Sequence, residues 1–332
     1  MSERKFRNSA FYKPNVVQIE FVQGCNRRCS FCGTRGLSSE LQFIDEEVLK
    51  KECRLIEASG YKPRILLSGH GENTLHPDFY HMVVVMRRLM PNAWIQIMTN
   101  GQSIRQNIKN LQKMFIAGIN DVTIDEYSDS RFNMDEFIPE LEELRVRQNI
   151  RVEHAIMGPG VPLYMPKNSA FRRLLIVPPI DLDEITMSRI LTNHCGAGAP
   201  PNTKRAGVTC TKVFRELSFR WDGNVALCCQ DFRGQYKVAN VMDEGVNTFD
   251  DLWRHPRLEA ARRILFHDKR TFFPCNICDT PALRPGLLPD QRGKQTMEQP
   301  TEKDYLIVNK RYPALSVMRR RPWEKPSMER EG

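Results

Sequence analysis

Short apolar runs alternate with amphipathic segments through the first half of the chain. Apolar runs lie at 16–22, 64–69, 94–101, 121–127 and 150–157, and segments with helical periodicity lie between them at 45–60, 76–90, 104–118 and 134–148. A short apolar run favours a buried strand, whereas apolar residues at every third or fourth position favour a helix. The alternation predicts an α/β fold with a parallel sheet, open or closed into a barrel, and such sheets bind ligands at the C-terminal ends of their strands.

The pattern changes in the second half of the chain. Residues 158–195 are expected to hold a loop, a helix and a final strand, and RELSFRWDGNVALCC (215–229) predicts a β-hairpin turned at Asp222-Gly223. A helix is expected at 246–268 and a tight knuckle at 274–279. We therefore expect a first domain at 1–195, a second at 196–284, and an irregular basic tail rich in Pro and Arg at 285–332.

Composition and charge narrow the class of protein. The 332 residues are 41% hydrophobic and 27% charged, as in globular proteins, and carry a net charge of +9. No run approaches the roughly 18 apolar residues of a membrane span, and the N-terminus lacks the apolar core of a secretory signal, so we expect a cytoplasmic protein without a membrane partner. The positive charge favours an anionic substrate, such as a nucleic acid, a nucleotide or an acidic peptide.

The ten cysteines are clustered, which argues against a disulfide framework. One group is Cys25, Cys29 and Cys32, and most of the others lie in the last 40% of the chain. Cysteines at short spacing indicate metal or iron–sulfur ligation. Three thiolates can hold three irons of a cubane [4Fe–4S] cluster and leave the fourth iron open, which is typical of a reactive site. A zinc site completed by His70 or His76 is the alternative.

The spacing Cys25-x3-Cys29-x2-Cys32, with Asn26 and Phe31 beside the cysteines, resembles the signature of radical S-adenosylmethionine (SAM) enzymes. The resemblance implies a partial (β/α)6 TIM-like barrel and a [4Fe–4S] cluster whose open iron chelates SAM. It also implies an external electron donor, such as flavodoxin or ferredoxin, and a 5′-deoxyadenosyl radical that removes hydrogen from a substrate.

Two further stretches resemble motifs of this family. SGHGENTLHPDF (68–79) is similar to the Gly-Gly-Glu-Pro motif, with His70 and Asn73 in place of a glycine and the proline, and Thr99-Asn100-Gly101 resembles a common turn. Ribose contacts are expected after the fourth strand, and contacts to the carboxylate end of SAM in the loop beyond the fifth. The resemblance thus implies SAM contacts from Gly69, Gly71, Glu72, Asn100, Asp125, Ser128, Asn168 and Arg172.

A second cysteine group resembles the SPASM domain found in many radical SAM enzymes. Cys210-x12-Gly223-x4-Cys228 fits the opening of that domain, and Cys275-x2-Cys278 follows. Without further cysteines, the match is to the shortened twitch form, a small α+β subdomain. The resemblance implies one auxiliary [4Fe–4S] cluster on these four cysteines. A zinc ribbon is the alternative, and Cys53, Cys195 and Cys229 are expected to be packing or free thiols.

We therefore predict a radical SAM enzyme that abstracts hydrogen from a peptide or a small polar metabolite, with an auxiliary cluster in electron transfer. One alternative is the same chemistry on a nucleotide or nucleic-acid base, suggested by the net charge and by RRRPW at 319–323. Another, from a different class, is a non-enzymatic zinc protein that binds nucleic acid.

Overall fold

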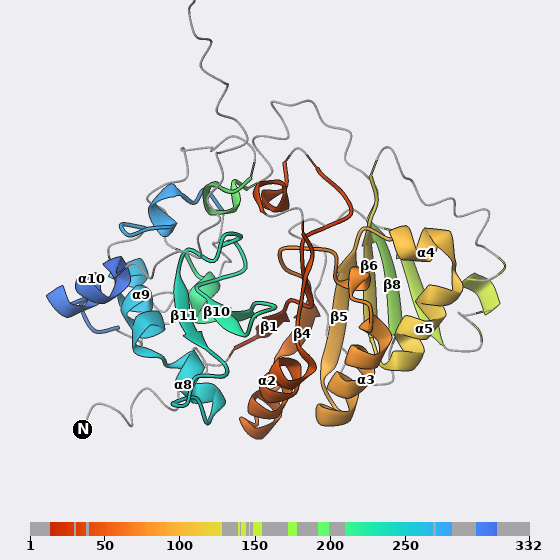
Figure 1. Ribbon diagram of the computed structural model, residues 1–332, viewed down its shortest axis with the longest axis horizontal. Coiled ribbons are helices and arrows are strands. Elements are labelled where there is room, and N and C mark those ends of the chain that lie inside the picture. The colour runs from red at the N-terminus through yellow and green to blue at the C-terminus, as the bar shows by residue number, and fades with distance from the viewer. Residues whose placement is uncertain are drawn as a thin grey trace, which may run out of the picture.

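A curved nine-stranded sheet forms the centre of the protein in the computed structural model (Figure 1). The structure describes residues 14–127 apart from 30, 38 and 39, parts of 139–154, and residues 172–177, 192–198, 210–267, 270–280 and 297–310. The strands lie in the order β11-β10-β9-β1-β4-β5-β6-β8-β7, and neighbours from β9 to β7 are all parallel. Their bounds are Val16–Ile19 (β1), Arg64–Leu67 (β4), Trp94–Thr99 (β5), Asp121–Asp125 (β6), Ile150–His154 (β7), Arg172–Val177 (β8), Glu216–Phe219 (β9), Asn224–Ala226 (β10) and Lys237–Asn240 (β11).

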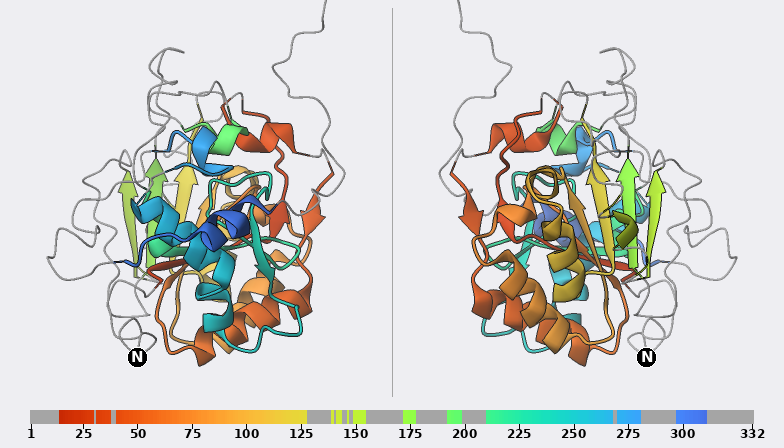
Figure 2. Two further views of the ribbon diagram at one scale, coloured as in Figure 1. Left: turned by 90° about the vertical axis from the view of Figure 1, so that its left-hand side faces the viewer. Right: turned by 90° about the vertical axis from the view of Figure 1, so that its right-hand side faces the viewer.

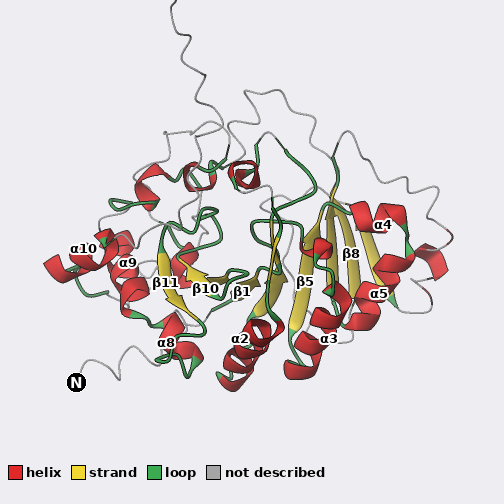
Figure 3. Cartoon of the chain, viewed as in Figure 1, coloured by secondary structure: helices red, strands yellow, loops and turns green. Residues whose placement is uncertain are grey.

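The predicted alternation of strands and helices is confirmed in the first half. Helices α2 (Glu46–Ala58), α3 (Phe79–Leu89), α4 (Gln102–Gln106) and α5 (Lys109–Ala117) connect β1, β4, β5 and β6 (Figure 3). Ile19, Ile65 and Ile97 on one face of the sheet belong to the same hydrophobic core as residues of α2, α3 and α5. Burying this apolar face against the helices is the main stabilising term of such a fold.

The other face of the same strands carries polar side chains. Gln18 on β1 pairs in register with Ser218 on β9, and Ser218 donates a hydrogen bond to Gln18 at 3.4 Å. Gln96 on β5 donates to Thr123 on β6 at 3.1 Å. All four side chains are buried. Parallel strands covered by apolar layers are usually hydrophobic on both faces, so these buried amides and hydroxyls distinguish this face from the one that packs on the helices.

The order of the last parallel strands differs from the prediction. The fifth predicted strand, 150–157, forms β7 at the edge of the sheet, and β8 inserts between β6 and β7. Arg172 was expected in a loop near the carboxylate end of SAM, and this prediction is wrong. It is the first residue of β8, and Arg173 pairs with Asp121 at the start of β6. Arg172 therefore lies at the amino ends of the strands, opposite the edge where the cysteine loop lies.

The predicted hairpin at Asp222-Gly223 is confirmed and extends the main sheet. β9 and β10 are antiparallel, and Gly223 has a φ of +75°, which the turn requires and glycine adopts freely. β9 also pairs in parallel with β1, from Val16 opposite Glu216 to Ile19 opposite Phe219. The strands of the second predicted domain thus share one sheet with those of the first.

The C-terminal third contains more helix than predicted. The helix expected at 246–268 is two helices, α8 (Phe249–Trp253) and α9 (Pro256–His267), because Pro256 cannot continue a helix but is well suited to begin one. Residues Glu302–Asn309, inside the expected tail, form α10, and Asp304 accepts two hydrogen bonds from Arg263 of α9 at 3.0 and 2.6 Å. No helix in the described ranges has the length and apolarity to cross a membrane.

Candidate functional site

The loop with Cys25, Cys29 and Cys32, here called the initiating site, follows β1 at the C-terminal edge of the sheet. Cys25 Sγ accepts a hydrogen bond from the amide of Arg27 at 3.3 Å, and Cys32 Sγ accepts one from the Thr34 hydroxyl at 3.1 Å. All three thiols are partly exposed. Donors aimed at sulfur stabilise the thiolate, which is the form that binds iron.

The three thiols lie close enough to affect one another. Burial raises the pKa of Cys25, and the charges of Glu72, Cys32 and Cys29 raise it further. Burial also raises the pKa of Cys32, with a smaller effect from Cys29. Three thiolates held together in this way repel one another, and a cationic iron centre would relieve that repulsion.

Gly71 places the predicted SAM-binding loop directly against the initiating site. The amide of Gly24 donates to the carbonyl of His70 at 3.0 Å, and the amide of Glu72 donates to the carbonyl of Gly24 at 2.9 Å. A Cβ atom on Gly71 would lie 2.3 Å from the carbonyl oxygens of both Gly24 and Val22. Only glycine allows this approach, which is the physical reason for a glycine at this position.

Glu72 ties the loop to the turn at 99–101. Its Oε2 accepts a hydrogen bond from the amide of Asn100 at 2.8 Å, and Oε1 accepts from the hydroxyls of Thr99 at 2.8 Å and Thr74 at 2.7 Å. The side chain of Asn100 in turn donates to Asn26 at 2.8 Å, beside Cys25. Glu72 and Asn100 thus lie beside the initiating site, and Glu72 links the loop at 71–74 to the turn at 99–101.

Asp125 ends β6 near the same site. Burial, together with the charge of Glu72, raises the pKa of Asp125 to about 6. Gly69 lies against Glu20, where a Cβ would be 3.2 Å from that side chain, in a backbone conformation with φ of +144°. Ser128 and Asn168, which were also expected to contact SAM, lie outside the described residues.

His70 connects the initiating loop to the second cysteine group. Its Nδ1 lies 2.7 Å from Glu20 Oε2, and its Nε2 lies 3.3 Å from the carbonyl oxygen of Cys229. His76, the other candidate for a zinc ligand, has its Nε2 3.2 Å from the carbonyl oxygen of Ile44 and accepts a hydrogen bond from the Asp78 amide through Nδ1. Both histidines use both ring nitrogens within the protein, which contradicts the zinc alternative at this site.

His194 forms a second connection. Its Nδ1 accepts a hydrogen bond from the amide of Gly33, next to Cys32, at 3.1 Å. Its ring stacks on Phe232 with centroids 4.2 Å apart, and Phe232 meets His70 edge-on at 4.5 Å. Burial lowers the pKa of His194 to about 4, so the ring is neutral and its Nδ1 is free to accept. Sequence reasoning missed His194 because its contacts are all distant in the chain.

The four cysteines predicted to hold the auxiliary cluster lie together. Figures 1 and 2 show η2 (Gly33–Gly36), η4 (His194–Gly196) and η7 (Cys275–Ile277) side by side above the C-terminal edge of the sheet. Burial raises the pKa of Cys275 well above its usual value, and the neighbouring thiols contribute to the same shift. We call this group the auxiliary site: Cys210, Cys228, Cys275 and Cys278, all buried.

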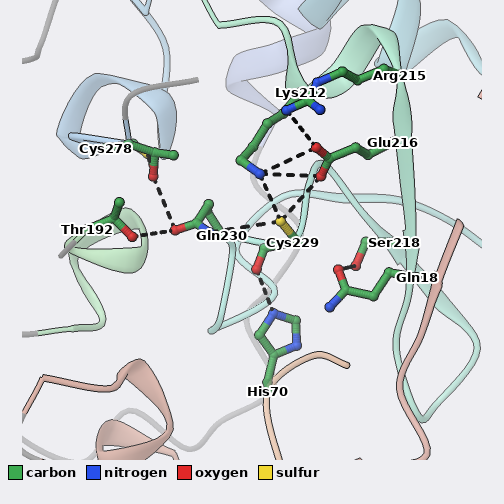
Figure 4. A network of polar contacts seen from close by, with 11 residues as sticks. Gln18, His70, Thr192, Lys212, Arg215, Glu216, Ser218, Cys229, Gln230 and Cys278 are labelled. Carbon is green, nitrogen blue, oxygen red and sulfur yellow. Dashed lines mark hydrogen bonds and ion pairs between the residues drawn. The ribbon is translucent and has the colours of Figure 1, made fainter. Parts of the chain in front are cut away.

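Cys229 turns away from the auxiliary site into a buried charged network (Figure 4). Lys212 donates to Cys229 Sγ at 3.3 Å, and Cys229 donates to Glu216 at 3.4 Å. Burial opposes charge on both Lys212 and Glu216, yet their neighbours raise the pKa of Lys212 and lower that of Glu216. Of the two adjacent cysteines, the geometry therefore favours Cys228 as the ligand, in agreement with the glycine spacing.

One thiol that sequence reasoning set aside belongs to this region. Cys195, in η4, is 3% exposed, and the neighbouring thiols of Cys228 and Cys278, together with burial, raise its pKa well above the usual value. Nothing in the sequence indicates this, because Cys195 lies outside the spacing pattern of the other cysteines. This placement depends on how η4 folds against η7.

Both donor sets consist of thiols alone, which are the usual ligands of iron–sulfur clusters. Within the ranges that the structure describes, no three His, Cys, Asp or Glu side chains converge as a single metal ion requires. A cubane spreads its thiolates over four irons, so its ligands surround a larger body than one ion does. The three partly exposed thiols could hold a cluster with one open iron, and the four buried ones could hold a closed cluster.

Comparison with known proteins agrees with this geometry. Residues 19–134 match the model of the radical SAM superfamily, and residues 210–279 match that of the SPASM iron–sulfur cluster-binding domain. The chain is 27% identical over 121 residues to molybdenum cofactor biosynthesis protein 1 of Bos taurus, and the match covers 36% of this chain and 19% of that relative.

Solved structures show the same fold. The crystal structure of BtrN in complex with AdoMet and 2-DOIA matches with a TM-score of 0.59 and 18% identity, over 81% of this chain and 94% of BtrN. A second BtrN structure, in an open conformation, matches with a TM-score of 0.55 and 16% identity, over 80% and 92% of the two chains. The chain therefore contains a radical SAM domain, of a superfamily whose enzymes use a [4Fe–4S] cluster and SAM, and a SPASM domain for an auxiliary iron–sulfur cluster.

Proposed function

We propose that this enzyme abstracts a hydrogen atom from a small polar metabolite bound against the polar face of the sheet. The observation that carries the proposal is the row of Gln18, Ser218, Gln96 and Thr123 on the face opposite the helices. When bound, the cluster and SAM supply the 5′-deoxyadenosyl radical. The solved BtrN complex also contains a second molecule, 2-DOIA, beside AdoMet.

The chemistry of this row favours a neutral or amine-bearing substrate. Amide and hydroxyl side chains donate and accept hydrogen bonds, and Asp125 at the end of β6 adds a carboxyl group. The phosphates of a nucleic acid are instead bound by Lys and Arg side chains and backbone amides. The basic tail motif at 319–323, which suggested nucleic acid, lies outside the described residues.

The chain's own residues orient the reacting groups. Glu72 holds the turn at Asn100 against the initiating site, and Gly71 lets the two loops pack without a gap. The metal ligands in this proposal are Cys25, Cys29, Cys32, Cys210, Cys228, Cys275 and Cys278, and the SAM contacts are Gly69, Gly71, Glu72, Asn100 and Asp125. The auxiliary site is closed by four thiolates, which suits electron transfer rather than substrate ligation. An external one-electron donor such as flavodoxin or ferredoxin would supply the reducing equivalent.

The test is anaerobic turnover with SAM, a reductant and pools of candidate substrates, with 5′-deoxyadenosine as the readout. Polyhydroxylated or amine-bearing metabolites should stimulate its formation, and peptides or oligonucleotides should not. The variant Gln96→Leu should raise the KM of the stimulating metabolite at least tenfold, since a site built to hydrogen-bond a substrate discriminates strongly. Its control is Ile97→Val on the apolar face, which should leave KM unchanged. Stimulation by oligonucleotides alone would overturn the choice of substrate class.

A further inference from the structure

We propose that Arg270 is a positioning residue of the auxiliary site, and that its buried positive charge raises the reduction potential of the auxiliary cluster. The inference rests on that cluster, which belongs to the proposed function, and deepens the electron-transfer role given to it there. Arg270 lies between α9 and η7 and is 5% exposed. It is not among the metal ligands or the SAM contacts of the proposed function.

The side chain of Arg270 reaches forward along the chain to a segment that carries two of the four ligands. Its Nη1 donates to the carbonyl oxygen of Cys278 at 2.6 Å, and its Nη2 donates to the carbonyl oxygen of Thr280 at 2.5 Å. The residues of η7, Cys275–Ile277, lie between Arg270 and these contacts in the sequence. The two hydrogen bonds therefore close the chain around the knuckle and fix the backbone at Cys278 itself.

The charge of Arg270 is buried without a carboxylate partner among the described residues. Its Nε has no hydrogen-bond partner there, and its other two contacts are the carbonyl groups already named. The carboxylate of Asp279, which lies between the two contacted residues, instead accepts a hydrogen bond from the amide of Asn193 at 2.7 Å. A buried charge is costly unless an opposite charge compensates for it. The four thiolates of the auxiliary site can supply that compensation.

The field of Arg270 reaches ligands on two different segments of the chain. Burial raises the pKa of Cys210 and that of Cys275, and the positive charge of Arg270 opposes the rise at both. An arginine is not deprotonated in proteins. Its effect on the auxiliary site is therefore permanent and does not depend on the titration of any group.

A fixed positive charge beside the auxiliary cluster has a definite direction of effect. A cubane held by four thiolates is an anion, and reduction adds one more negative charge. Coulombic attraction therefore stabilises the reduced cluster more than the oxidised one, and it is stronger in a buried site than in water. Charge and burial are among the factors that set the reduction potential of such clusters. Arg270 should thus make the auxiliary cluster a better acceptor of an electron.

The test uses the full chain with Cys25→Ala, Cys29→Ala and Cys32→Ala, which leaves the auxiliary cluster alone to be measured. In this background, Arg270→Gln removes the charge and keeps an amide that can donate to a carbonyl group. Iron content and an EPR-monitored redox titration are measured after anaerobic reconstitution. We expect Arg270→Gln to keep about four irons and to lower the reduction equilibrium constant about tenfold, a shift of about −59 mV for one electron.

Two further variants separate the charge of Arg270 from its hydrogen bonds. Arg270→Lys keeps a positive charge and should keep most of the potential at neutral pH. The matched control is Arg257→Gln. Arg257 is 6% exposed and donates to the carbonyl oxygens of Lys237 in β11, at 2.8 Å, and of Ile307 in α10, at 3.1 Å. This control should change neither the iron content nor the potential.

An unchanged potential in Arg270→Gln would overturn the proposal, and so would an equal fall in Arg270→Lys. If Arg270→Gln holds no iron, Arg270→Met, which is also neutral, takes its place in the titration. Loss of iron from both neutral variants but not from Arg270→Lys would support the role of the charge. Loss from all three would leave Arg270 a purely structural residue and overturn the proposal. A background variant without iron would instead overturn the auxiliary cluster itself, and with it the electron transfer of the proposed function.

Discussion

The ring of His70 places Nε2 3.3 Å from the carbonyl oxygen of Cys229, so a residue of the predicted SAM-binding loop contacts the chain next to an auxiliary ligand. The backbone carbonyl of His70 also accepts a hydrogen bond from Gly24, next to Cys25. A single residue thus contacts both cysteine-bearing loops. The glycine that usually stands at this position in the family motif could accept the backbone hydrogen bond from Gly24, but it has no side chain to contact Cys229.

We expect His70→Ala to loosen both cysteine sites. The change leaves Glu20 buried without its hydrogen-bond partner, and leaving a buried acceptor unsatisfied in this way costs about 1–3 kcal/mol. Urea unfolding would measure the loss, and EPR line shapes would show whether both clusters become heterogeneous. The matched control is His81→Ala on the exposed side of α3, which should cost less than about 1 kcal/mol. Equal effects from the two variants would refute the connecting role of His70.

Gly71→Ala should prevent assembly of the initiating site. The added Cβ would lie 2.3 Å from two backbone carbonyl oxygens, which cannot move as a flexible side chain can. Overpacking of this kind costs about 1–3 kcal/mol or more. The measurements are soluble yield and iron content after reconstitution. Gly245→Ala is the control, because nothing lies within 4 Å of the added Cβ. Normal iron content in Gly71→Ala would contradict the predicted close approach.

We expect the stability of the protein to depend on pH through the buried carboxyl group of Glu52 on α2. It is fully buried, and neither carboxyl oxygen has a hydrogen-bond partner among the described residues. Burial, with the charges of Asp222 and Glu20, raises the pKa of Glu52 well above its usual value. The unfolded chain ionises first, so the folded state loses stability as pH rises above about 4.5.

The variant Glu52→Gln removes this ionisation. It should be more stable than the natural protein by about 1–3 kcal/mol at pH 8, with a smaller difference at pH 5. Urea unfolding at the two pH values measures both. Glu57→Gln, exposed on the same helix, should show no such dependence. A difference that does not vary with pH would mean that the carboxyl group keeps its charge in the folded protein.

The last described helix should be part of the stable fold. Asp304→Ala removes both the bidentate pair with Arg263 and the capping box with Thr301 of α10. Caps and partly buried pairs of this kind contribute about 1–2 kcal/mol together. Thermal unfolding should show the loss, and limited proteolysis should cut first near α10. Glu302→Ala, exposed in the same helical turn, is the control and should have little effect.

The sequence predicted the elements whose patterns are local. The strands β1, β4, β5 and β6 and the hairpin at Gly223 follow from apolar runs and turn residues. The insertion of β8 between β6 and β7 could not be predicted, because strand order depends on pairing between distant segments. For α10 a local signal existed, since Thr301-x-x-Asp304 before an apolar run is a capping pattern.

The residues of the candidate site likewise fall into those that local motifs predict and those that depend on contacts between distant segments. Gly71, Glu72 and the cysteines were identified from motifs that lie within a few residues of one another. The position of Cys195 depends on contacts between Asn193 and Asp279, which are 86 residues apart, and no periodicity or spacing reveals such a contact. The glycine spacing favoured Cys228 over Cys229 as the ligand, and the contacts of Lys212 and Glu216 around Cys229 supply the physical reason.

The parallel pairing of β1 with β9 has a consequence for synthesis on the ribosome. Gln18 and its partner Ser218 are 200 residues apart, so one edge of β1 waits unpaired while most of the chain is made. The cysteines of the initiating site are synthesised early, but the sheet beside them is complete only after the hairpin of β9 and β10 has been synthesised. A cluster inserted into the initiating site before that point would bind to an incompletely folded sheet. Cluster insertion should therefore follow completion of the chain.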